Sequence, residues 1–223
     1  MARRRGYEDR CGIARALDVV GERWALLLVR ELLLGPKRYG DLQGGLGHIS
    51  PDVLSQRLRG LEEAGILARR TLPPPASVPV YELTERGRSL EPVLVALGRW
   101  GAGTPLPEAA VPMSVDAHLV SLRTLFSPER AGDLRARIAL DLGRDRARVR
   151  IADGTIAVER GEDPAADATI AAEPSVLLAV LRQRRSLADA EAAGELRLDG
   201  DRDAAQRFLT LFPLPDPAPA LAS

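Results

Sequence analysis

A change in composition near the middle of the chain constrains the fold most. Two Gly and three Pro fall within residues 101–112. Glycine and proline at this density end a helix and do not allow it to continue. The charge changes at the same place: residues 1–100 carry 16 Lys and Arg against 12 Asp and Glu, whereas residues 101–223 carry 15 against 19. We therefore predict domains over 1–103 and 113–213, a linker over 104–112 and a Pro-rich tail over 214–223.

The overall composition excludes several classes of protein. Hydrophobic residues make up 45% and charged residues 28%, and the net charge is zero, as in globular proteins but not in basic proteins that coat nucleic acids. One Cys excludes a disulfide within the chain, and with two His it leaves little for a zinc site, so we expect no metal and no cofactor. No apolar run reaches the length of a membrane span, and no signal-peptide core follows the basic start, so we expect a cytoplasmic protein.

The first part of the chain has the pattern of a small helical domain. Apolar residues at helical spacing predict helices over residues 15–20, 23–34 and 39–46. The second of these is apolar on nearly every face, as in a buried central helix, and Gly35-Pro36 should end it. We expect Gly44, Gly45 and Gly47 to form the turn after the third helix.

The next segment has the strongest functional pattern. Ser50 is a good N-cap, and Pro51 follows at the first helical position, where its missing N–H costs nothing. The helix over 51–64 should bury Leu54, Leu58 and Leu61. Its other side offers Asp52, Gln56 and Arg59, with Ser55 at the edge. Such side chains can contact base edges and phosphates, although an isolated helix with this pattern is usually just solvated on that side.

A hairpin follows this helix. Ile66–Arg70 and Val78–Leu83 are predicted strands joined by a Pro-rich turn. A helix from Thr84 to Trp100 then follows, and Pro92 within it predicts a kink or a restart. A short helix, a capped helix and a hairpin with a basic flank are the order of a winged helix-turn-helix, in which the second helix enters the major groove.

Several segments in this order resemble the HxlR-type regulators. They are Cys11–Trp24, Arg30-Glu31-Leu32, Arg38-Tyr39-Gly40-Asp41-Leu42, Ile49–Leu58 and Tyr81–Gly87. The resemblance covers about residues 10–101 and implies a bacterial or archaeal transcription regulator that binds double-stranded DNA, with a palindromic operator, as a homodimer. The apolar stripe that ends at Trp100 suits dimerisation, and packing within the chain is the alternative.

From the pattern and the resemblance together we select the residues expected to contact DNA. They are Arg38, Ser50, Pro51, Asp52, Ser55, Gln56, Arg57, Arg59, Arg69 and Arg70.

Cys11 suggests a second way to regulate such a protein. Some HxlR-type regulators use a Cys at this position as a thiol switch for electrophiles or oxidants, and Arg10 and Arg15 could favour the thiolate here. Most members carry Pro after this Cys, whereas this chain carries Gly12. An inert thiol is the alternative.

The second half of the chain has the pattern of an α+β layer. A helix is predicted over 115–126, and strands are predicted over 137–142, 149–151, 155–159, 168–171 and 195–198. Helices are expected from Pro174, over 186–192 and over 201–212. Short turns between alternating runs predict an antiparallel sheet with helices on one face.

This half resembles the sterol carrier protein-like fold. The resemblance lies in Ile151-Ala152-Asp153-Gly154, Ala166–Ile170, Gly194–Asp201 and Phe208–Phe212, and covers about residues 114–213. That family binds apolar small molecules between sheet and helices, so the resemblance implies an effector-sensing domain. The residues expected to line the site are Leu140, Ile151, Ile156, Val158, Leu178, Leu181, Phe208 and Phe212. The alternative is that these side chains are simply core.

Three functions compete at this point. A ligand-responsive transcription regulator accounts for both halves. An enzyme would need a nucleophile with a base, paired acids or a metal cluster, and we find no catalytic residues: Asp141, Asp145 and Asp153 are scattered at strand ends. A lipid-binding or interaction module without regulatory DNA binding is the third, and the intact Ser50-Pro51 cap argues against it.

Overall fold

A computed structural model describes residues 6–104 and 113–215. The chain divides into two compact units, Met1–Leu94 and Val95–Ser223, which are described separately. The basic start, most of the proposed linker and most of the Pro-rich tail lie outside the described residues. Among the residues described, no helix is both long and apolar enough to cross a membrane.

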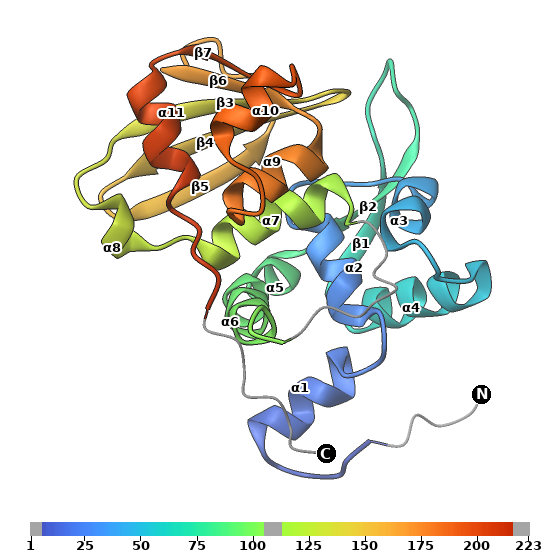
Figure 1. The fold of residues 1–223 in the computed structure, drawn as a ribbon. Helices are drawn as coiled ribbons and strands as arrows, with labels where there is room; N and C mark the ends of the chain where they lie inside the picture. The colour runs from blue at the N-terminus through green and yellow to red at the C-terminus, as the bar shows by residue number, and fades with distance from the viewer. Residues whose placement is uncertain (1–5, 105–112, 216–223) are drawn as a thin grey trace. The chain divides into compact units, whose positions relative to one another are not determined.

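The N-terminal unit has the element order of a winged helix-turn-helix (Figure 1). Its elements are α1 (Gly12–Val20), α2 (Ala25–Leu32), α3 (Tyr39–Leu46), α4 (Pro51–Glu63), β1 (Leu67–Thr71), β2 (Pro79–Leu83), α5 (Glu85–Arg88) and the first part of α6 (Glu91–Gly101). The strands β1 and β2 form an antiparallel hairpin with Leu67 opposite Leu83. The expected restart at Pro92 is confirmed, because α5 ends at Arg88 and α6 begins at Glu91.

One expected turn is wrong. Gly44 and Gly45 lie inside α3, and the turn begins at Gly47, whose φ of 66° is left-handed. Glycine tolerates that backbone conformation without the clash of a Cβ. The apolar spacing of Leu42 and Leu46, both buried in the core, carries the helix through the two glycines.

The core of this unit gathers around α2. Leu28 and Val29 are fully buried there, and they belong to one cluster with Leu42, Leu54 and Leu58 from the helix-turn-helix. At about 25 cal/mol per Å² of apolar surface removed from water, each such Leu stabilises the fold by roughly 1.5–3 kcal/mol. The buried leucines of α4 therefore anchor one side of that helix in the core, and the polar side of the helix faces solvent.

The C-terminal unit is built on a five-stranded sheet. Its elements after α6 are α7 (Val115–Leu125), α8 (Pro128–Ala131), β3 (Ala136–Leu142), β4 (Asp145–Ala152), β5 (Thr155–Arg160), β6 (Ala168–Ala172), α9 (Pro174–Leu181), α10 (Leu187–Ala192), β7 (Leu196–Gly200) and α11 (Arg202–Leu209). The strand order is β5-β4-β3-β6-β7.

The expectation of an antiparallel sheet is wrong at one pair. The strands β3, β4 and β5 form the predicted antiparallel meander, and β7 is antiparallel to β6. However, β6 pairs with β3 in parallel, with Ile138 opposite Ala168. The chain leaves the edge strand β5 and crosses to the far side of β3, so β6 enters the sheet in the direction of β3. The sheet is therefore mixed.

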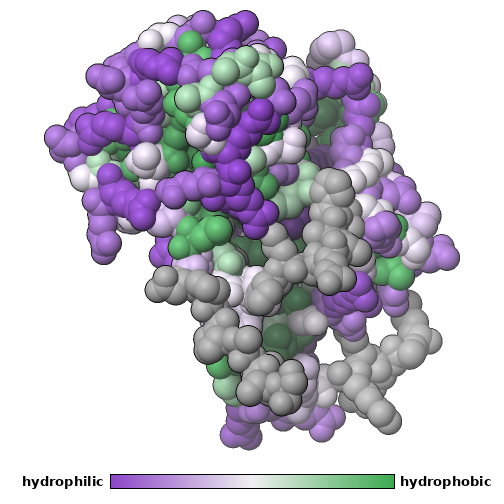
Figure 2. Space-filling view, in the orientation of Figure 1, coloured by the Kyte–Doolittle hydropathy of each residue, from purple (hydrophilic) through white to green (hydrophobic). Residues whose placement is uncertain are grey.

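Within the described residues of the C-terminal unit, helices cover one face of this sheet, and we call the other face, on which Arg137, Arg148 and Arg150 are exposed, the open face. Figure 1 shows α7, α9, α10 and α11 on the same side of the strands. Alternate residues point toward them: Ile138, Leu140, Val149 and Ile151 are at most 1% exposed. The outward sides of the helices are polar, as Figure 2 shows over the C-terminal unit, and α11 places Phe208 inward and Gln206 outward.

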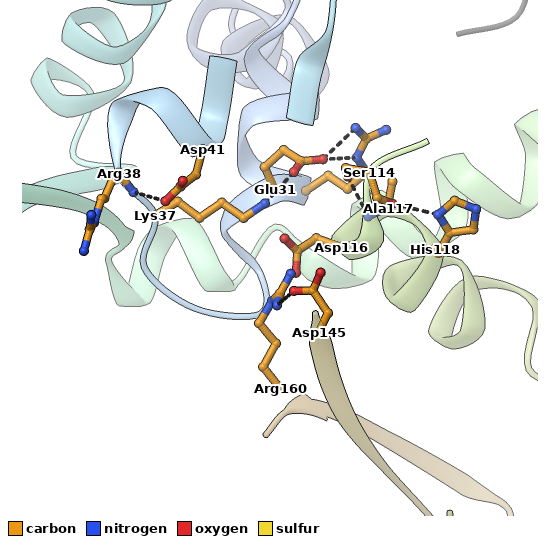
Figure 3. Close-up of polar contacts among 11 residues, drawn as sticks. Glu31, Lys37, Arg38, Asp41, Ser114, Asp116, Ala117, His118, Asp145 and Arg160 are labelled. Atoms are coloured by element: carbon orange, nitrogen blue, oxygen red, sulfur yellow. Dashed lines mark hydrogen bonds and ion pairs between the residues drawn. The ribbon is translucent and has the colours of Figure 1, made fainter. Parts of the chain in front are cut away.

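An ion-pair cluster joins α7 to the edge of the sheet. Arg160 on β5 binds the buried carboxylate of Asp116 on α7 through Nε at 2.7 Å, and it also pairs with Asp145 on β4 (Figure 3). The hydrogen bond with Asp116 raises the pKa of the Arg160 guanidinium, against the opposing effect of burial. Arg160 thus links α7 to two strands of the sheet through charged contacts.

Candidate nucleic-acid interface

The helix α4 presents its polar side to solvent. The Ser50 hydroxyl accepts a hydrogen bond from the Val53 amide at 3.4 Å and caps the helix, and Pro51 occupies its first turn. Asp52, Gln56 and Arg59 are exposed. The sequence prediction for these side chains agrees with where the structure places them, while their contact with DNA stays a prediction.

A tyrosine from the preceding helix positions the start of α4, and sequence reasoning missed it. The Tyr39 hydroxyl donates to the Pro51 carbonyl at 2.9 Å and lies 3.2 Å from the Ser55 hydroxyl oxygen. The two helices of the helix-turn-helix are thus joined by a polar contact as well as by the leucine core. One hint was available in the sequence. The apolar spacing of α3 needs only an aromatic ring at its first position, but the residue there, Tyr39, also carries a hydroxyl group.

We expect Tyr39→Phe to lower the free energy of unfolding by about 1 kcal/mol, because it removes a hydrogen bond and leaves the ring in place. Urea unfolding measures the change. Tyr81→Phe is the matched control, since no hydrogen bond of the Tyr81 hydroxyl is found among the described residues. Equal stability of the two variants would show that the Tyr39 hydroxyl does not hold the helices together.

Two other arginines selected from the sequence differ from each other in their contacts. Arg57 forms an ion pair with Glu22 at 2.8 Å, and only 19% of its side chain is exposed. The side chain of Arg38 is exposed, and its backbone amide donates to Asp41 at 3.1 Å at the start of α3 (Figure 3). Arg57 is therefore paired within the protein through one terminal nitrogen, although its buried Nε has no partner among the described residues, whereas Arg38 keeps its guanidinium in solvent.

The hairpin carries the other basic residues. Arg69 and Arg70 are both exposed on β1, and Arg70 pairs with Glu82 on β2 through Nε at 2.7 Å. No partner of Arg69 is found in the described part of the chain. Of the two arginines, Arg69 is therefore the one whose guanidinium is more available to bind a phosphate.

Cys11 lies just before α1, and its side chain is exposed as a free thiol. Its backbone amide donates to Asp9 at 2.9 Å. The thiol is therefore accessible to a reagent in solution.

Most of the residues selected for an apolar ligand lie in the core of the C-terminal unit. Leu140, Ile151, Val158 and Phe208 are at most 1% exposed, and Phe212 is 3% exposed. Leu178 and Leu181 also line a small apolar crevice of about 10 Å³ between α7 and α9, together with His118, Leu122 and Leu177. The structure thus brings two of the selected residues to a crevice and five others into packed core, while Ile156 on β5 is half-buried.

Comparison with known proteins divides the chain as the composition does. Residues 19–107 match the HxlR-like helix-turn-helix family, and residues 108–219 match the alkyl sulfatase C-terminal family. The second match gives the family of this half, while the sterol carrier protein-like resemblance stays a prediction.

The curated relatives match the N-terminal half. An HTH-type transcriptional regulator of Mycobacterium tuberculosis is 44% identical over 89 residues, which are 40% of this chain and 56% of the relative. The regulator YvaP of Bacillus subtilis is 35% identical over 86 residues, which are 39% of this chain and 80% of YvaP. The chain thus spans about half the length of the mycobacterial relative and most of the Bacillus one.

A solved structure, the redox regulator HypR in its oxidized form, is 31% identical, with a TM-score of 0.41, and the match covers 44% of this chain and all of that one. From the sequence matches, the chain belongs to the HxlR-like helix-turn-helix family of transcriptional regulators and carries a C-terminal domain of the alkyl sulfatase C-terminal family.

Proposed function

We propose that the protein is a transcriptional regulator that binds a palindromic operator as a homodimer, with α4 as the recognition helix. The observation that carries this proposal is the exposed polar side of α4, with Gln56 and Arg59 outward and Leu54 and Leu58 fixed in the core. Bidentate side chains of this kind distinguish bases in the major groove. Relatives of the N-terminal half that are HTH-type transcriptional regulators support it.

The helix α6 supports the dimer. Val93, Leu97 and Trp100 recur on one side of α6 at helical spacing, and they are 53%, 44% and 79% exposed. Burying such a stripe against the same stripe of a second copy would remove apolar surface from water. A symmetric dimer would then present two α4 helices to major grooves one turn apart, about 34–36 Å.

We expect Arg59→Ala to lower affinity for the operator by about 1–3 kcal/mol and to leave affinity for random DNA nearly unchanged, because a base contact carries sequence discrimination. Arg69→Ala on the hairpin is the contrasting variant. It should weaken binding to all sequences and reduce the slope of log affinity against log salt concentration by roughly 1, as expected for the loss of one phosphate contact. Titrations of operator and random duplexes at several salt concentrations separate the two.

If Arg59→Ala lowered affinity equally for the operator and the random duplex, the assignment of α4 as the helix that recognises the base sequence would be contradicted. A changed sequence preference with Arg69→Ala, at constant salt dependence, would contradict the phosphate role of the hairpin.

For the C-terminal unit we propose an effector domain of sterol carrier protein-like architecture that binds an apolar small molecule. The apolar lining of the crevice between α7 and α9, which includes Leu178 and Leu181, supports this assignment, and a ligand would have to part these side chains because the crevice measures only about 10 Å³. An effector alters DNA affinity only if it binds the DNA-competent and incompetent states unequally. The alternative for this unit is a module for assembly or partner binding.

A thiol switch is the second candidate for regulation. The observation in its favour is the exposed thiol of Cys11 at the start of α1. Alkylation of that thiol with iodoacetamide should then change operator affinity, and Cys11→Ser should abolish the change.

A further inference from the structure

The open face of the sheet in the C-terminal unit collects arginines at its β5 side. Arg137 projects from β3, and Arg148 and Arg150 project from β4, all three away from the helices and exposed. Their inward neighbours Ile138, Val149 and Ile151 are buried. The alternation of the strands therefore brings three guanidinium groups to one side of two adjacent strands.

Two of these arginines face each other directly. Arg137 and Arg150 are register partners in the antiparallel pair of β3 and β4. Residues in such positions have Cβ atoms about 4.5–5.5 Å apart, and like charges there destabilise the sheet. Nothing in the core requires this arrangement, because both side chains point into solvent.

The flanking charges are already neutralised, whereas Arg150 is not. Arg137 donates to Asp163 through Nε at 3.1 Å, and Arg148 donates to Glu159 through Nε at 2.8 Å. The hydrogen bond from Arg137 holds the pKa of the Asp163 carboxyl below its usual range, with a further contribution from Arg148. No hydrogen bond or ion pair of Arg150 is found within residues 6–104 and 113–215.

The surface is hollowed at this point. Arg137, Arg148 and Arg150 line a recess of about 420 Å³ together with Glu159 and Asp163. Ala157 on β5, the register partner of Arg150, also lines it. Its short side chain leaves room beside the Arg150 guanidinium.

We propose that this recess binds a small molecule that bears a phosphate group. Three arginines and two carboxylates leave one net positive charge around the recess, and a phosphate beside Arg150 would complement it. It would also offset the repulsion between Arg150 and Arg137. The planar guanidinium presents paired N–H donors that match two phosphate oxygens. The site is separate from the apolar crevice between α7 and α9, because it lies on the opposite face of the sheet.

A nucleic-acid backbone fits this recess less well than a small phosphate ester. A duplex needs a row of cations along its phosphates. The open face instead alternates signs, with Asp141 and Arg146 paired beyond the recess on one side and Arg197 and Asp199 paired on β7. The positive charge is therefore local to Arg150.

The test uses the full-length protein, with inorganic phosphate and phenyl phosphate as probes at constant ionic strength. Binding is followed by the NMR signal of the Arg150 Nε–Hε group. We expect this signal to shift on titration, and Arg150→Ala to weaken phosphate binding by about tenfold or more, since it removes a charge-assisted pair of hydrogen bonds. Arg150→Lys should retain part of the affinity.

Arg197→Ala is the matched control, because Arg197 is exposed on β7 of the same sheet and is paired with Asp199 outside the recess. It should leave phosphate binding unchanged. The proposal is overturned if neither probe shifts the Arg150 signal, or if Arg150→Ala and Arg197→Ala weaken binding equally. It is also overturned if a random DNA duplex shifts the signal while phenyl phosphate does not.

Discussion

Glu31→Ala should lower the free energy of unfolding of the N-terminal unit by about 3–5 kcal/mol, the usual cost of removing one partner from a buried ion pair. The Glu31 carboxylate on α2 is fully buried and binds Arg30 at 2.8 Å and the Lys37 ammonium at 2.6 Å (Figure 3). Arg30 and Lys37 are themselves only 24% and 13% exposed. Solvent therefore screens these contacts little, and the variant leaves two cations without this carboxylate.

The position of Lys37 gives Glu31 a role in the architecture as well. The Lys37 backbone exchanges two hydrogen bonds with Tyr81 on β2, at 2.9 and 2.8 Å. Glu31 thereby ties α2 to the point where the chain meets the hairpin and enters the helix-turn-helix. Loss of this carboxylate should loosen both α3 and the hairpin, and with them the placement of α4.

Urea unfolding followed by Trp24 fluorescence, in a Trp100→Phe background, measures this unit, because Trp24 packs against its core. Glu62→Ala is the matched control on an exposed site of α4 and should change stability by less than about 0.5 kcal/mol. A Glu31→Ala variant as stable as that control would show that the ion pairs are not needed for the fold.

The sequence was most informative where short-range chemistry decides the structure. The Ser50-Pro51 cap and the spacing of Leu54, Leu58 and Leu61 fix α4, and they predicted its start, its buried face and its exposed face. Pro92 likewise predicted the restart into α6, because proline suits the first turn of a helix and not its interior.

Apart from the misplaced turn at Gly44 and Gly45, what the sequence did not predict comes from interactions between residues far apart in the chain. Period-two alternation is the same in parallel and antiparallel strands, so the pattern of Ala168–Ala172 could not show that β6 runs parallel to β3. The same limit applies to side-chain partners in the candidate interface. Arg57 forms an ion pair with Glu22, 35 residues earlier, which no local pattern could indicate, and its contact with DNA stays a prediction.

Phe208→Ala should lower the free energy of unfolding of the C-terminal unit by about 3–5 kcal/mol, the range for truncating a fully buried aromatic residue. Phe208 is 0% exposed, and its ring lies 5.1 Å from that of Phe212 in an edge-to-face arrangement. Phe212 lies in turn 6.4 Å from Phe126. The variant therefore loses apolar burial and an aromatic contact together, and leaves a cavity. Gln206→Ala, on the exposed side of the same helix, is the control.

The size of that loss also distinguishes two forms of the effector proposal. If Phe208 borders only packed core, the full 3–5 kcal/mol is lost, and the new apolar cavity should bind benzene, which raises the Tm of the variant but not of the wild type. If the ring already borders a ligand cavity, fewer contacts are lost, and the effect falls below about 2 kcal/mol.

In either case dodecan-1-ol should raise the Tm of the wild type. Leu178→Asp should remove that rise, because it places a charge in the apolar crevice. A wild-type Tm that no apolar probe raises would leave the C-terminal unit as a module for assembly or partner binding.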